Sequence, residues 1–390
     1  MRILHTSDWH IGIRIGEYNL IDEQRYALQQ IINIARNEHP DAIIVAGDVY
    51  DRAVPSAEAV MLFDEILVEL ASLKTEVFII AGNHDSAERL AYASRLISLS
   101  HIHISPVYNG IVEPIVLKKG DEQLAFYLLP YLKPAIIRHI AEDECTIEAY
   151  NDAMRYVVEK MPLEEHCCNV LIAHQFITNS ERTDSEDMLI GGLDNIDSEV
   201  FSRFDYVALG HLHRAQSCSY PTIRYSGTPM KYSFSEAKDV KSVSIIDIIP
   251  STTGEKHNEV TIRNHPITPL HEWYDLRGTY DQLTSLDYYR DTNYTEAFVR
   301  ITLTDEEDIP NGQRMLKAIY HRLVELRYDN TRTRQGITPI GLADTVRKQL
   351  PIDLMNELYL KQNGQVMSEQ QQLYMQQMIE QVFQTDKPTL

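Results

Sequence analysis

Three consecutive polar side chains follow one short apolar run in this chain. Asn83, His84 and Asp85 come directly after Gly82, which ends the apolar run of residues 77–81. A run of this length predicts a buried strand, and a glycine at its end lets the backbone turn sharply and approach another group closely. Amide, imidazole and carboxylate groups at a strand end can bind a metal ion or transfer protons. The motif is weak by itself, because many loops contain such residues.

Four other apolar runs end in side chains of the same kinds. These side chains are Asp8 and His10, Asp48 and Asp51, His174, and His211 and His213. In the Asp-x-His and His-x-His spacings, alternate residues of an extended segment face the same side. Oxygen and imidazole ligands without a thiolate suit Mn²⁺, Fe²⁺, Mg²⁺ or Zn²⁺. So many ligands exceed one tetrahedral site and predict two divalent ions, which at a separation of about 3.5–4 Å clamp the attacking and leaving oxygens of a phosphoryl transfer.

Each of these motifs also has a simpler interpretation. A single Asp-x-His or His-x-His is more typical of a surface loop than of a ligand pair. Asp85 is equally well explained as the cap of a helix that begins near Ser86. The five loops together favour one convergent site, because they recur in order and each follows an apolar run.

The runs that carry these side chains alternate with segments of helical periodicity. We expect strands over residues 2–7, 41–46 and 77–81, separated by helices over residues 22–38 and 56–73. Strand–helix–strand units of these lengths predict right-handed crossovers in an α/β fold. In such a sheet the carboxyl ends of parallel strands lie at one edge, which is where α/β proteins place their chemistry.

Composition and periodicity divide the chain into four segments. They are a catalytic domain over residues 1–265, a small α+β cap domain over 270–332, a linker over 333–350 and a helical segment over 351–390. In the cap, the clearest strand covers residues 297–303 and the clearest helix covers residues 312–326. The last segment carries apolar residues at helical spacing, and short amphipathic helices need a surface on which to dock. Those residues are Leu354, Leu358, Met378, Ile379, Val382 and Phe383.

The bulk composition narrows the class of protein. With 390 residues, of which 44% are hydrophobic, the chain can bury a sizeable core. It has no apolar run long enough for a membrane span, no secretory signal and four cysteines without CxxC spacing, so we expect a cytoplasmic protein without membrane contact. A net charge of −21 argues against a free-standing basic DNA-binding domain. It does not exclude nucleic acid, because metal ions and a partner can supply positive charge.

The complete set of motifs resembles that of the calcineurin-like metallophosphoesterases. The resemblance is carried by Asp8-x-His10, Gly47-Asp48-x-x-Asp51, Gly82-Asn83-His84-Asp85, His174 and Gly210-His211-x-His213. Over about residues 1–250, the segments around these motifs are similar to the SbcD family of nuclease subunits. The resemblance implies an α/β fold in which a β-sandwich is flanked by helices and followed by a small cap domain and C-terminal helices.

The same resemblance implies a role for each site residue. One ion would take Asp8, His10 and His213, the other would take Asn83, His174 and His211, and Asp48 would bridge them. His84 would stabilise developing charge or protonate the leaving oxygen, and the Asp51 carboxylate would orient its ring. The ions implied are two divalent cations, with Mn²⁺ expected and Mg²⁺ as the alternative.

The resemblance also implies a function, that of a metal-dependent DNA nuclease with double-strand exonuclease and single-strand or hairpin endonuclease activity. Such a subunit works with the ATPase SbcC in a heterotetramer-type complex in DNA repair, recombination and replication, and it associates with the nucleoid. Residues 351–390 would bind SbcC, and SbcC would supply ATP binding, since this chain lacks GxxxxGK[ST]. A phosphomonoesterase or cyclic-nucleotide phosphodiesterase on the same fold is one alternative, and a non-catalytic scaffold is another.

The sequence also offers candidate residues for contact with DNA and for a homodimer. The candidates for contact with DNA phosphates are Arg14, Arg52, Arg182, Lys231 and Tyr232. Basic and hydroxyl groups contact phosphates without reading sequence, and a solvated side chain is the alternative for each. The helix around Leu90, Ala93, Leu96 and Ile97 could support a homodimer, as in relatives, and core packing explains its apolar face equally well.

Overall fold

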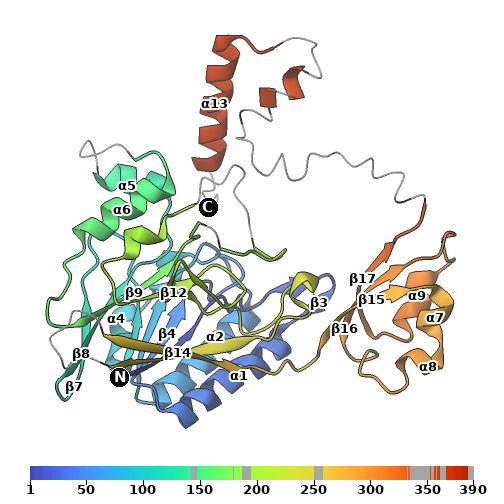
Figure 1. Ribbon diagram of the computed structural model, residues 1–390, viewed down its shortest axis with the longest axis horizontal. Helices are drawn as coiled ribbons and strands as arrows, with labels where there is room; N and C mark the ends of the chain where they lie inside the picture. The colour runs from blue at the N-terminus through green and yellow to red at the C-terminus, as the bar shows by residue number, and fades with distance from the viewer. Residues whose placement is uncertain are drawn as a thin grey trace.

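The fold is described from a computed structural model of the chain (Figure 1). It describes residues 1–141, 147–178, 180–186, 195–249, 258–331, 333, 352, 355–356, 358–360 and 366–384. Leu354 and most of the expected linker over 333–350 lie outside the described residues. The side chains of Ile379, Val382 and Phe383 also lie outside this description, although their backbone is helical.

One six-stranded sheet carries the first three expected strands. Its order is β14-β13-β1-β4-β5-β6, and β1, β4, β5 and β6 run parallel. The strands are β1 (Arg2–Thr6), β4 (Ala42–Ala46), β5 (Glu76–Ile80), β6 (Ile102–Ile104), β13 (Ser242–Ile249) and β14 (Glu259–Pro266). The helices α1 (Ile21–Glu38) and α2 (Ala57–Ser72) pack their apolar faces on this sheet. The expected strand–helix–strand pattern is therefore confirmed.

A second six-stranded sheet has the order β11-β12-β10-β9-β8-β7. The strands are β7 (Ile115–Lys119), β8 (Glu122–Leu128), β9 (Cys168–His174), β10 (Tyr206–Gly210), β11 (Gln216–Cys218) and β12 (Tyr220–Tyr225). The strands β8, β9, β10 and β12 run parallel. Its outer face is covered by α5 (Pro134–Ala141), α6 (Tyr150–Lys160) and η2 (Ser198–Phe201).

The two sheets bury an apolar core between them. Ile44 and Phe78 of the first sheet share one cluster of buried residues with Phe126 and Ile172 of the second. The rings of Phe78 and Phe126 stack with their centroids 4.2 Å apart. Strands buried on both faces read as continuous apolar runs rather than alternating ones, which is why these strands stood out in the sequence. The expected β-sandwich flanked by helices is thus confirmed.

Short elements connect the sandwich strands. They are β2 (Arg14–Ile15), β3 (Tyr18–Asn19), α3 (Ala87–Leu90), α4 (Ser94–Ile97), η1 (Ser98–Ser100) and η3 (Phe234–Glu236). The N-cap of α3 is Ser86, whose hydroxyl accepts the amide hydrogen of Arg89. Capping by Asp85, the simpler interpretation of that residue, is therefore wrong, and its carboxylate has another role.

A separate three-stranded sheet forms the cap. Its parallel strands are β15 (Trp273–Gly278), β16 (Phe298–Leu303) and β17 (Arg322–Tyr328), and its helices are α7 (Tyr280–Thr284), α8 (Leu286–Tyr289) and α9 (Gly312–Lys317). The expected helix over residues 312–326 is wrong, because the helix ends at Lys317 and a strand follows. Leu316, Tyr320 and Leu323 keep helical spacing and are all buried in the cap core. Periodicity could therefore not separate the helix from the strand.

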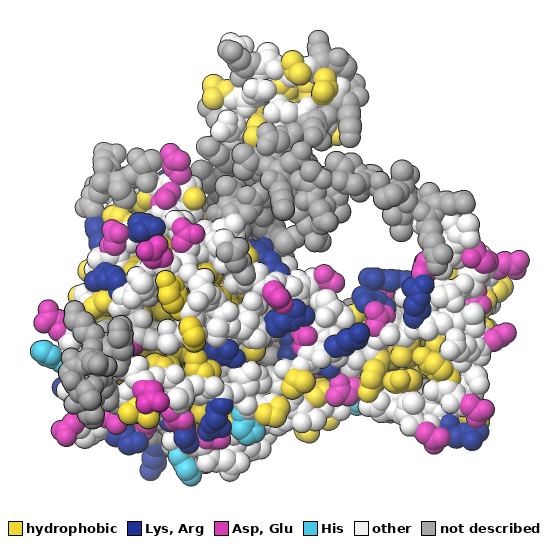
Figure 2. All heavy atoms as spheres, viewed as in Figure 1, with side chains coloured by type: hydrophobic (Ala, Val, Ile, Leu, Met, Phe, Trp, Pro, Cys, Tyr) yellow, Lys and Arg dark blue, Asp and Glu magenta, His cyan; other side chains and the backbone are white. Residues whose placement is uncertain are grey.

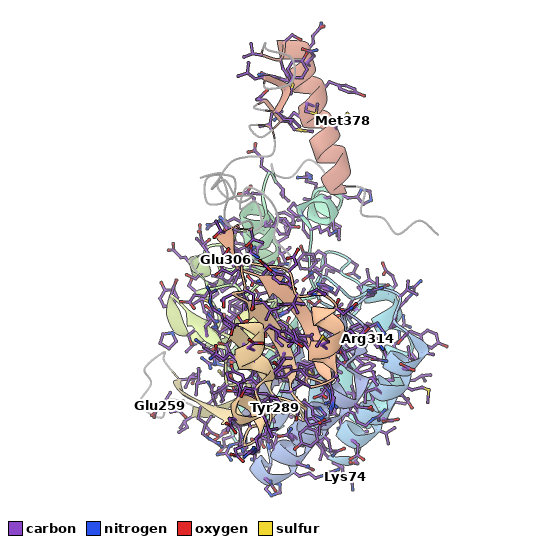
Figure 3. The ribbon with its side chains drawn as sticks, turned by 90° about the vertical axis from the view of Figure 1, so that its right-hand side faces the viewer. Lys74, Glu259, Tyr289, Glu306, Arg314 and Met378 are labelled. Atoms are coloured by element: carbon purple, nitrogen blue, oxygen red, sulfur yellow. The ribbon has the colours of Figure 1, made fainter. Side chains whose placement is uncertain are left out.

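The cap contacts the sandwich at the β2–β3 hairpin (Figure 1). The Tyr18 hydroxyl donates to the carbonyl oxygen of His321 at 3.2 Å, and the Lys317 ammonium group pairs with Glu17 at 2.5 Å. The last helix, α13 (Glu369–Gln384), stands clear of the sandwich, and Met378 marks it when the molecule is viewed from the cap side (Figure 3). Among the described residues, none of the helices combines the length and apolar character needed to cross a membrane.

Candidate metal centre

The carboxyl ends of five parallel strands meet at one edge of the sandwich. They belong to β1, β4 and β5 in the first sheet and to β9 and β10 in the second. The expected ligands that these ends carry are Asp8, His10, Asp48, Asn83, His174, His211 and His213. The structure brings all seven together in one cluster of mutual contacts.

Four of these ligand residues adopt a backbone conformation that side chains other than glycine rarely take. Their φ angles are 52° for Asp8, 43° for His10, 49° for Asp48 and 102° for His211. The loops are held in this state by main-chain hydrogen bonds, because Asp8 N donates to Gly47 O at 3.0 Å and His10 N donates to Asp48 O at 2.9 Å. Such strain clusters at functional sites, where the surrounding structure fixes it.

Glycines at these strand ends permit close approach within one sheet and between the two sheets. Within the first sheet, a Cβ atom on Gly82 would lie 2.1 Å from Asp48 Oδ1, and between the sheets, one on Gly210 would lie 1.8 Å from the carbonyl oxygen of Ala46. The obstacle at Gly210 is backbone, which cannot move aside as the end of a flexible side chain could. The close contact between β4 and β10 therefore requires a residue without a Cβ atom at position 210.

We expect Gly210→Ala to lower the free energy of unfolding by about 3 kcal/mol, at the upper end of the cost of overpacking. The added methyl group must push β10 away from β4, since it overlaps the Ala46 carbonyl oxygen. Chemical denaturation of the metal-free chain measures this effect. Gly312→Ala is the control, because its nearest neighbour is the Ile309 side chain at 3.2 Å. A Gly210→Ala variant as stable as that control would contradict the close approach.

The first group of donors combines one carboxylate with two imidazoles. Asp8, His10 and His213 each offer a ligand atom, and these atoms lie within 4.8 Å of one another. The two Nε2 atoms of His10 and His213 face each other at 3.2 Å. Asp8 Oδ2 is buried and has no hydrogen-bond partner among the described residues. A buried carboxylate oxygen without a partner beside two facing ring nitrogens is the arrangement that a shared cation would satisfy.

The second group of donors surrounds Asn83. Its Oδ1 atom lies 3.0 Å from His174 Nε2 and 2.9 Å from His211 Nδ1. Asp48 Oδ2 lies 3.3 Å from His174 Nε2 and 3.6 Å from His10 Nε2, so this carboxylate stands between the two groups. Oxygen and imidazole donors of this kind fit a divalent ion such as Mn²⁺, Fe²⁺, Mg²⁺ or Zn²⁺.

Burial controls the protonation of these donors. It lowers the pKa of His10 and of His211 to about 3, which leaves both rings neutral and able to offer a lone pair. Burial and the nearby Asp48 carboxylate raise the pKa of Asp8 to about 7. Burial by itself would lower the pKa of His174, but Asp48 and Asp8 raise it to about 9. In the metal-free chain, protons thus occupy part of the site that a cation would occupy.

The affinity for Mn²⁺ should therefore rise with pH between 6 and 9. Binding requires deprotonated His174 and Asp8, whose pKa values are about 9 and about 7. Above pH 7 one proton is displaced and the affinity should rise about tenfold per pH unit, and below pH 7 two are displaced and the slope should double. Calorimetric titration in buffers of different ionisation enthalpy measures the affinity and the number of protons displaced at each pH. An affinity that is constant from pH 7 to 8.5 would contradict this linkage.

His84 lies beside the donors with its ring fixed by the main chain. Its Nδ1 atom lies 2.9 Å from the carbonyl oxygen of Asp51, and its backbone N–H donates to Asp48 Oδ1 at 2.9 Å. The Asp51 carboxylate contacts the Arg52 guanidinium at 3.3 Å. The carbonyl oxygen of Asp51 thus makes one contact with the ring, and the Asp51 carboxylate lies close enough to interact electrostatically with His84. The orienting role that the resemblance implies for this carboxylate stays a prediction.

Asp85 holds the loop that carries Asn83 and His84. Its carboxylate accepts the backbone N–H groups of Val49, Tyr50 and Gly82 at 2.9–3.0 Å. Burial raises the pKa of Asp85 to about 6. This carboxylate therefore links the loop after β5 to the loop after β4. Asp85 serves this structural role, whereas Asn83 of the same loop belongs to a donor group.

The candidate DNA contacts divide into exposed and buried side chains. Arg14 and Arg52 are exposed, and the Arg182 guanidinium lies 3.5 Å above the centre of the Phe176 ring. Lys231 is buried and donates to the Ala237 carbonyl oxygen at 2.8 Å and to Glu272 at 3.1 Å. Tyr232 is buried and donates to the Trp9 carbonyl oxygen. We therefore reassign Lys231 and Tyr232 from DNA contact to support of the loops around the site.

Gln24 supports the loop that carries His10, and the motifs in the sequence did not predict this role. Its Nε2 atom donates to the carbonyl oxygens of Trp9 at 2.9 Å and His10 at 2.7 Å, and its Oε1 atom accepts from Gly12 N at 2.9 Å. Gln24 lies on the buried face of α1 among apolar residues such as Leu28. A polar residue on an apolar helical stripe is the signal that could have identified it.

Comparisons with known proteins agree with this geometry. A family model described as calcineurin-like phosphoesterase matches residues 1–215. The D subunit of nuclease SbcCD from Staphylococcus epidermidis is 33% identical over 330 residues, which cover 84% of this chain and 85% of that protein. The corresponding protein of Staphylococcus saprophyticus is 30% identical over 331 residues, which cover 84% of each chain.

A solved structure, TT1561 of Thermus thermophilus, aligns with 67% of this chain and 98% of its own at 11% identity and a TM-score of 0.37. The family assignment does not rest on this partial overlap. It rests on the family model and on the two staphylococcal relatives, and it confirms the family expected from the motifs. The chain belongs to the calcineurin-like phosphoesterases and, within them, to the family formed by the D subunits of nuclease SbcCD.

Proposed function

We propose that this chain is a two-metal DNA nuclease, with double-strand exonuclease and single-strand or hairpin endonuclease activity. The observation that carries the proposal is the position of Asp48 between two groups of buried donors, 3.6 Å from His10 and 3.3 Å from His174. The names of the staphylococcal relatives, which are nuclease subunits, support the substrate class. Mn²⁺ is the ion we propose, with Mg²⁺ as the alternative, because the carboxylate and amide oxygens of the site suit both ions.

Each residue of the centre has one task in this proposal. Asp8, His10, His213, Asn83, His174, His211 and Asp48 would hold the ions. Bound divalent ions supply Lewis-acid charge that stabilises the phosphoryl oxygens in the transition state. The protein keeps the donor atoms in place with strained loops, so that little rearrangement is needed when a phosphodiester binds.

His84 is the residue that we propose for proton transfer to the leaving oxygen. If its Nδ1–H donates to the Asp51 carbonyl oxygen at 2.9 Å, its Nε2 atom is the one that exchanges a proton with substrate. The ring must then carry protons on both nitrogens when it acts as an acid. The imidazole ring of His10 lies edge to face with it at 4.7 Å, which keeps His84 beside the donor groups.

DNA would approach through the exposed arginines and the cap. Arg14 lies on β2, in the hairpin that contacts the cap, and Arg52 follows the loop of Asp48. Figure 2 shows Lys and Arg side chains on the part of the cap that faces the sandwich. Local positive charge of this kind matters in a chain with a net charge of −21, because phosphate contacts provide most of the sequence-independent affinity.

One assay distinguishes a nuclease from the two alternatives. The full-length chain is incubated with Mn²⁺ and labelled single-stranded, hairpin or duplex DNA, and in parallel with a small phosphomonoester. We expect DNA cleavage that depends on added ion and is lost on chelation. Turnover of the monoester alone would favour a phosphomonoesterase, and no turnover with tightly bound ions would favour a scaffold.

We also propose that the C-terminal helices bind SbcC and that α4 and η1 form a homodimer contact. On α13, the side chains of Leu373 and Tyr374 are 61% and 64% exposed. Near α4, those of Leu96 and Leu99 are 71% and 82% exposed, whereas Leu90 is buried in the core, as the core-packing alternative expects. Large exposed apolar side chains that gather in one place are typical of interaction surfaces.

Removal of residues 333–390 should abolish capture of SbcC and leave Mn²⁺ binding unchanged. The expected donors lie before residue 214, and the removed residues include the exposed face of α13. Pull-down with purified SbcC and Mn²⁺ titration of the same preparation measure both properties. Capture of SbcC at full strength by the shortened chain would contradict the docking role.

A further inference from the structure

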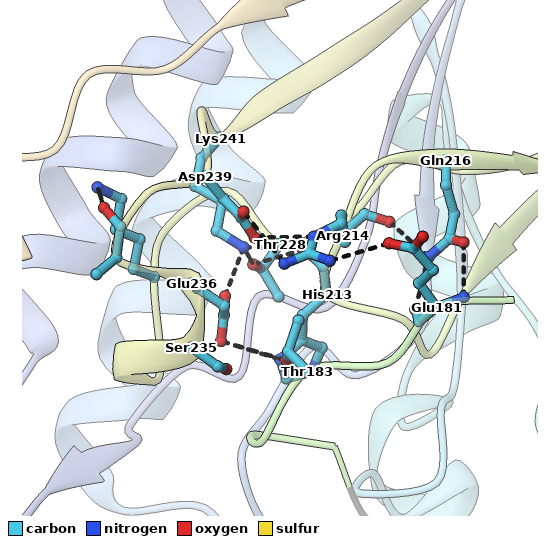
Figure 4. Close-up of polar contacts among 12 residues, drawn as sticks. Glu181, Thr183, His213, Arg214, Gln216, Thr228, Ser235, Glu236, Asp239 and Lys241 are labelled. Carbon is cyan, nitrogen blue, oxygen red and sulfur yellow. Dashed lines mark hydrogen bonds and ion pairs between the residues drawn. The ribbon is translucent and has the colours of Figure 1, made fainter.

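A buried polar network encloses the loop that carries His213 (Figure 4). Glu236 is fully buried, and the Lys241 ammonium group contacts its Oε2 atom at 2.5 Å. The same ammonium group donates to Thr228 Oγ1 at 2.8 Å and to the carbonyl oxygen of His213 at 2.9 Å. All three ammonium hydrogens therefore have partners, which is the condition under which a buried ion pair can be tolerated.

Ser185 connects this ion pair to the ring of His213. Its Oγ atom lies 2.6 Å from Glu236 Oε1 and 2.7 Å from His213 Nδ1. A carboxylate paired with Lys241 can only accept, so the single hydroxyl hydrogen of Ser185 must point to Glu236. The Oγ atom then accepts from Nδ1–H of His213. This assignment leaves the lone pair of His213 on Nε2, the atom that faces His10 Nε2 at 3.2 Å.

Glu186, which follows Ser185 in the sequence, fixes the main chain of His213. Glu186 Oε1 accepts the backbone N–H of His213 at 2.6 Å, and the other carboxylate oxygen accepts the backbone N–H of Thr183. Two adjacent residues of one loop thus hold both the ring and the backbone of His213. Lys241 holds its carbonyl oxygen from the opposite side, at 2.9 Å.

We propose that Glu236 and Ser185 are positioning residues, which hold His213 in the Nδ1–H tautomer and thereby raise the affinity of the centre for a divalent cation. Partners of this kind orient a ligating histidine and increase its basicity, and their loss typically costs about 10–100-fold in metal affinity. The role in cation binding rests on the proposed metal centre, whereas the tautomer does not. The two parts can therefore be measured separately.

The first measurement is the tautomer of His213 in the metal-free, full-length chain. Nitrogen-15 NMR of labelled histidine distinguishes a protonated Nδ1 from a protonated Nε2, and the His213→Gln variant identifies the signals. We expect the Nδ1–H form in the parent chain and loss of that preference in Ser185→Ala and Glu236→Gln. Ser185→Thr, which keeps a hydroxyl group, should restore it. Parent-like spectra of both variants would overturn the proposal.

The second measurement is the affinity of the same proteins for Mn²⁺. We expect Ser185→Ala and Glu236→Gln to weaken binding of one ion by about 10–100-fold, and Ser185→Thr to recover most of it. Ser233→Ala is the matched control, because Ser233 donates to Glu236 Oε1 at 3.0 Å, and no contact between Ser233 and His213 is among those described. Circular dichroism of the metal-free variants shows whether they fold, and Ser185→Ala serves alone if Glu236→Gln does not.

The two measurements distinguish the tautomer of His213 from its effect on the affinity for a cation. A changed tautomer with parent-like affinity for Mn²⁺ would overturn the positioning role. Ser233→Ala weakened as much as Ser185→Ala would also overturn it, because the effect would then come from general disturbance of Glu236. If the parent chain bound no Mn²⁺ at all, the proposed function would fail, while the spectra would still decide whether Ser185 and Glu236 set the tautomer.

Discussion

Asp48→Asn should abolish tight binding of both ions and reduce DNA cleavage by about a thousandfold or more, since the transition-state charge that the ions stabilise is worth several kcal/mol. The reason is the position of Asp48 Oδ2, 3.6 Å from His10 Nε2 and 3.3 Å from His174 Nε2. An asparagine keeps an oxygen that can accept the His84 backbone N–H, so the loop should stay in place. The change therefore removes charge with little effect on shape.

The measurements are kcat/KM for single-stranded DNA and the number of Mn²⁺ ions bound at saturation. Asp287→Asn is the control, because the Asp287 side chain is 88% exposed on α8 of the cap, away from the donor groups. It should leave both numbers unchanged. An Asp48→Asn chain that still bound two ions with parent-like affinity would show that this carboxylate does not join the two groups.

His84→Gln should lower the turnover number for DNA by about 10²–10⁴-fold, which is the usual contribution of general acid catalysis. We expect its affinity for Mn²⁺ to stay within about threefold of the parent value, because His84 acts on the leaving oxygen rather than on the ions. The measurement pairs DNA with bis(p-nitrophenyl) phosphate. The nitrophenolate leaving group needs little protonation, so the defect should be much smaller for that substrate.

This variant also tests a different role for His84. A ring nitrogen of His84 lies within 4.8 Å of ligand atoms of His10 and Asp48, so the residue could instead bind a cation. In that case His84→Gln would weaken Mn²⁺ binding, and the loss of activity would be equal for both substrates. Those two results together would contradict the proposed role in proton transfer.

Most of the donor set was predictable because the strands that precede the donors run parallel and are buried on both faces. Runs such as residues 42–46 and 170–173 are apolar throughout, so the polar residues that follow them mark the strand ends. Parallel strands then bring those ends to the same edge. Types and spacing of residues sufficed to identify Asp48 and His174 as members of one cluster.

Other features were not predictable, because they depend on contacts that side-chain type does not encode. One contact of the His84 ring is made by the main-chain carbonyl oxygen of Asp51, a group that every amino acid possesses. Lys231 looks like a surface cation in the sequence, yet the fold buries it against Glu272. In the sequence, Glu236 and Lys241 look like an ordinary solvated ion pair. In the fold, they are buried beside the loop of His213.

The cap shows the limit of periodicity as a guide. Leu316, Tyr320 and Leu323 have the spacing of one helical face, and all three are buried. The chain nevertheless leaves the helix at Lys317, because residues 322–328 pair with β16 as a parallel strand. A strand partner distant in the sequence decided the local structure, and no local pattern reports such a partner.

The number of Mn²⁺ ions that the folded chain binds tests the two-ion centre most directly. Equilibrium dialysis at pH 8, with the bound ion counted by electron paramagnetic resonance after acid release, gives this number for the full-length chain. Two ions per chain are expected, falling to none bound tightly in Asp48→Asn. One ion per chain, or two that persist in Asp48→Asn, would contradict a centre that Asp48 joins.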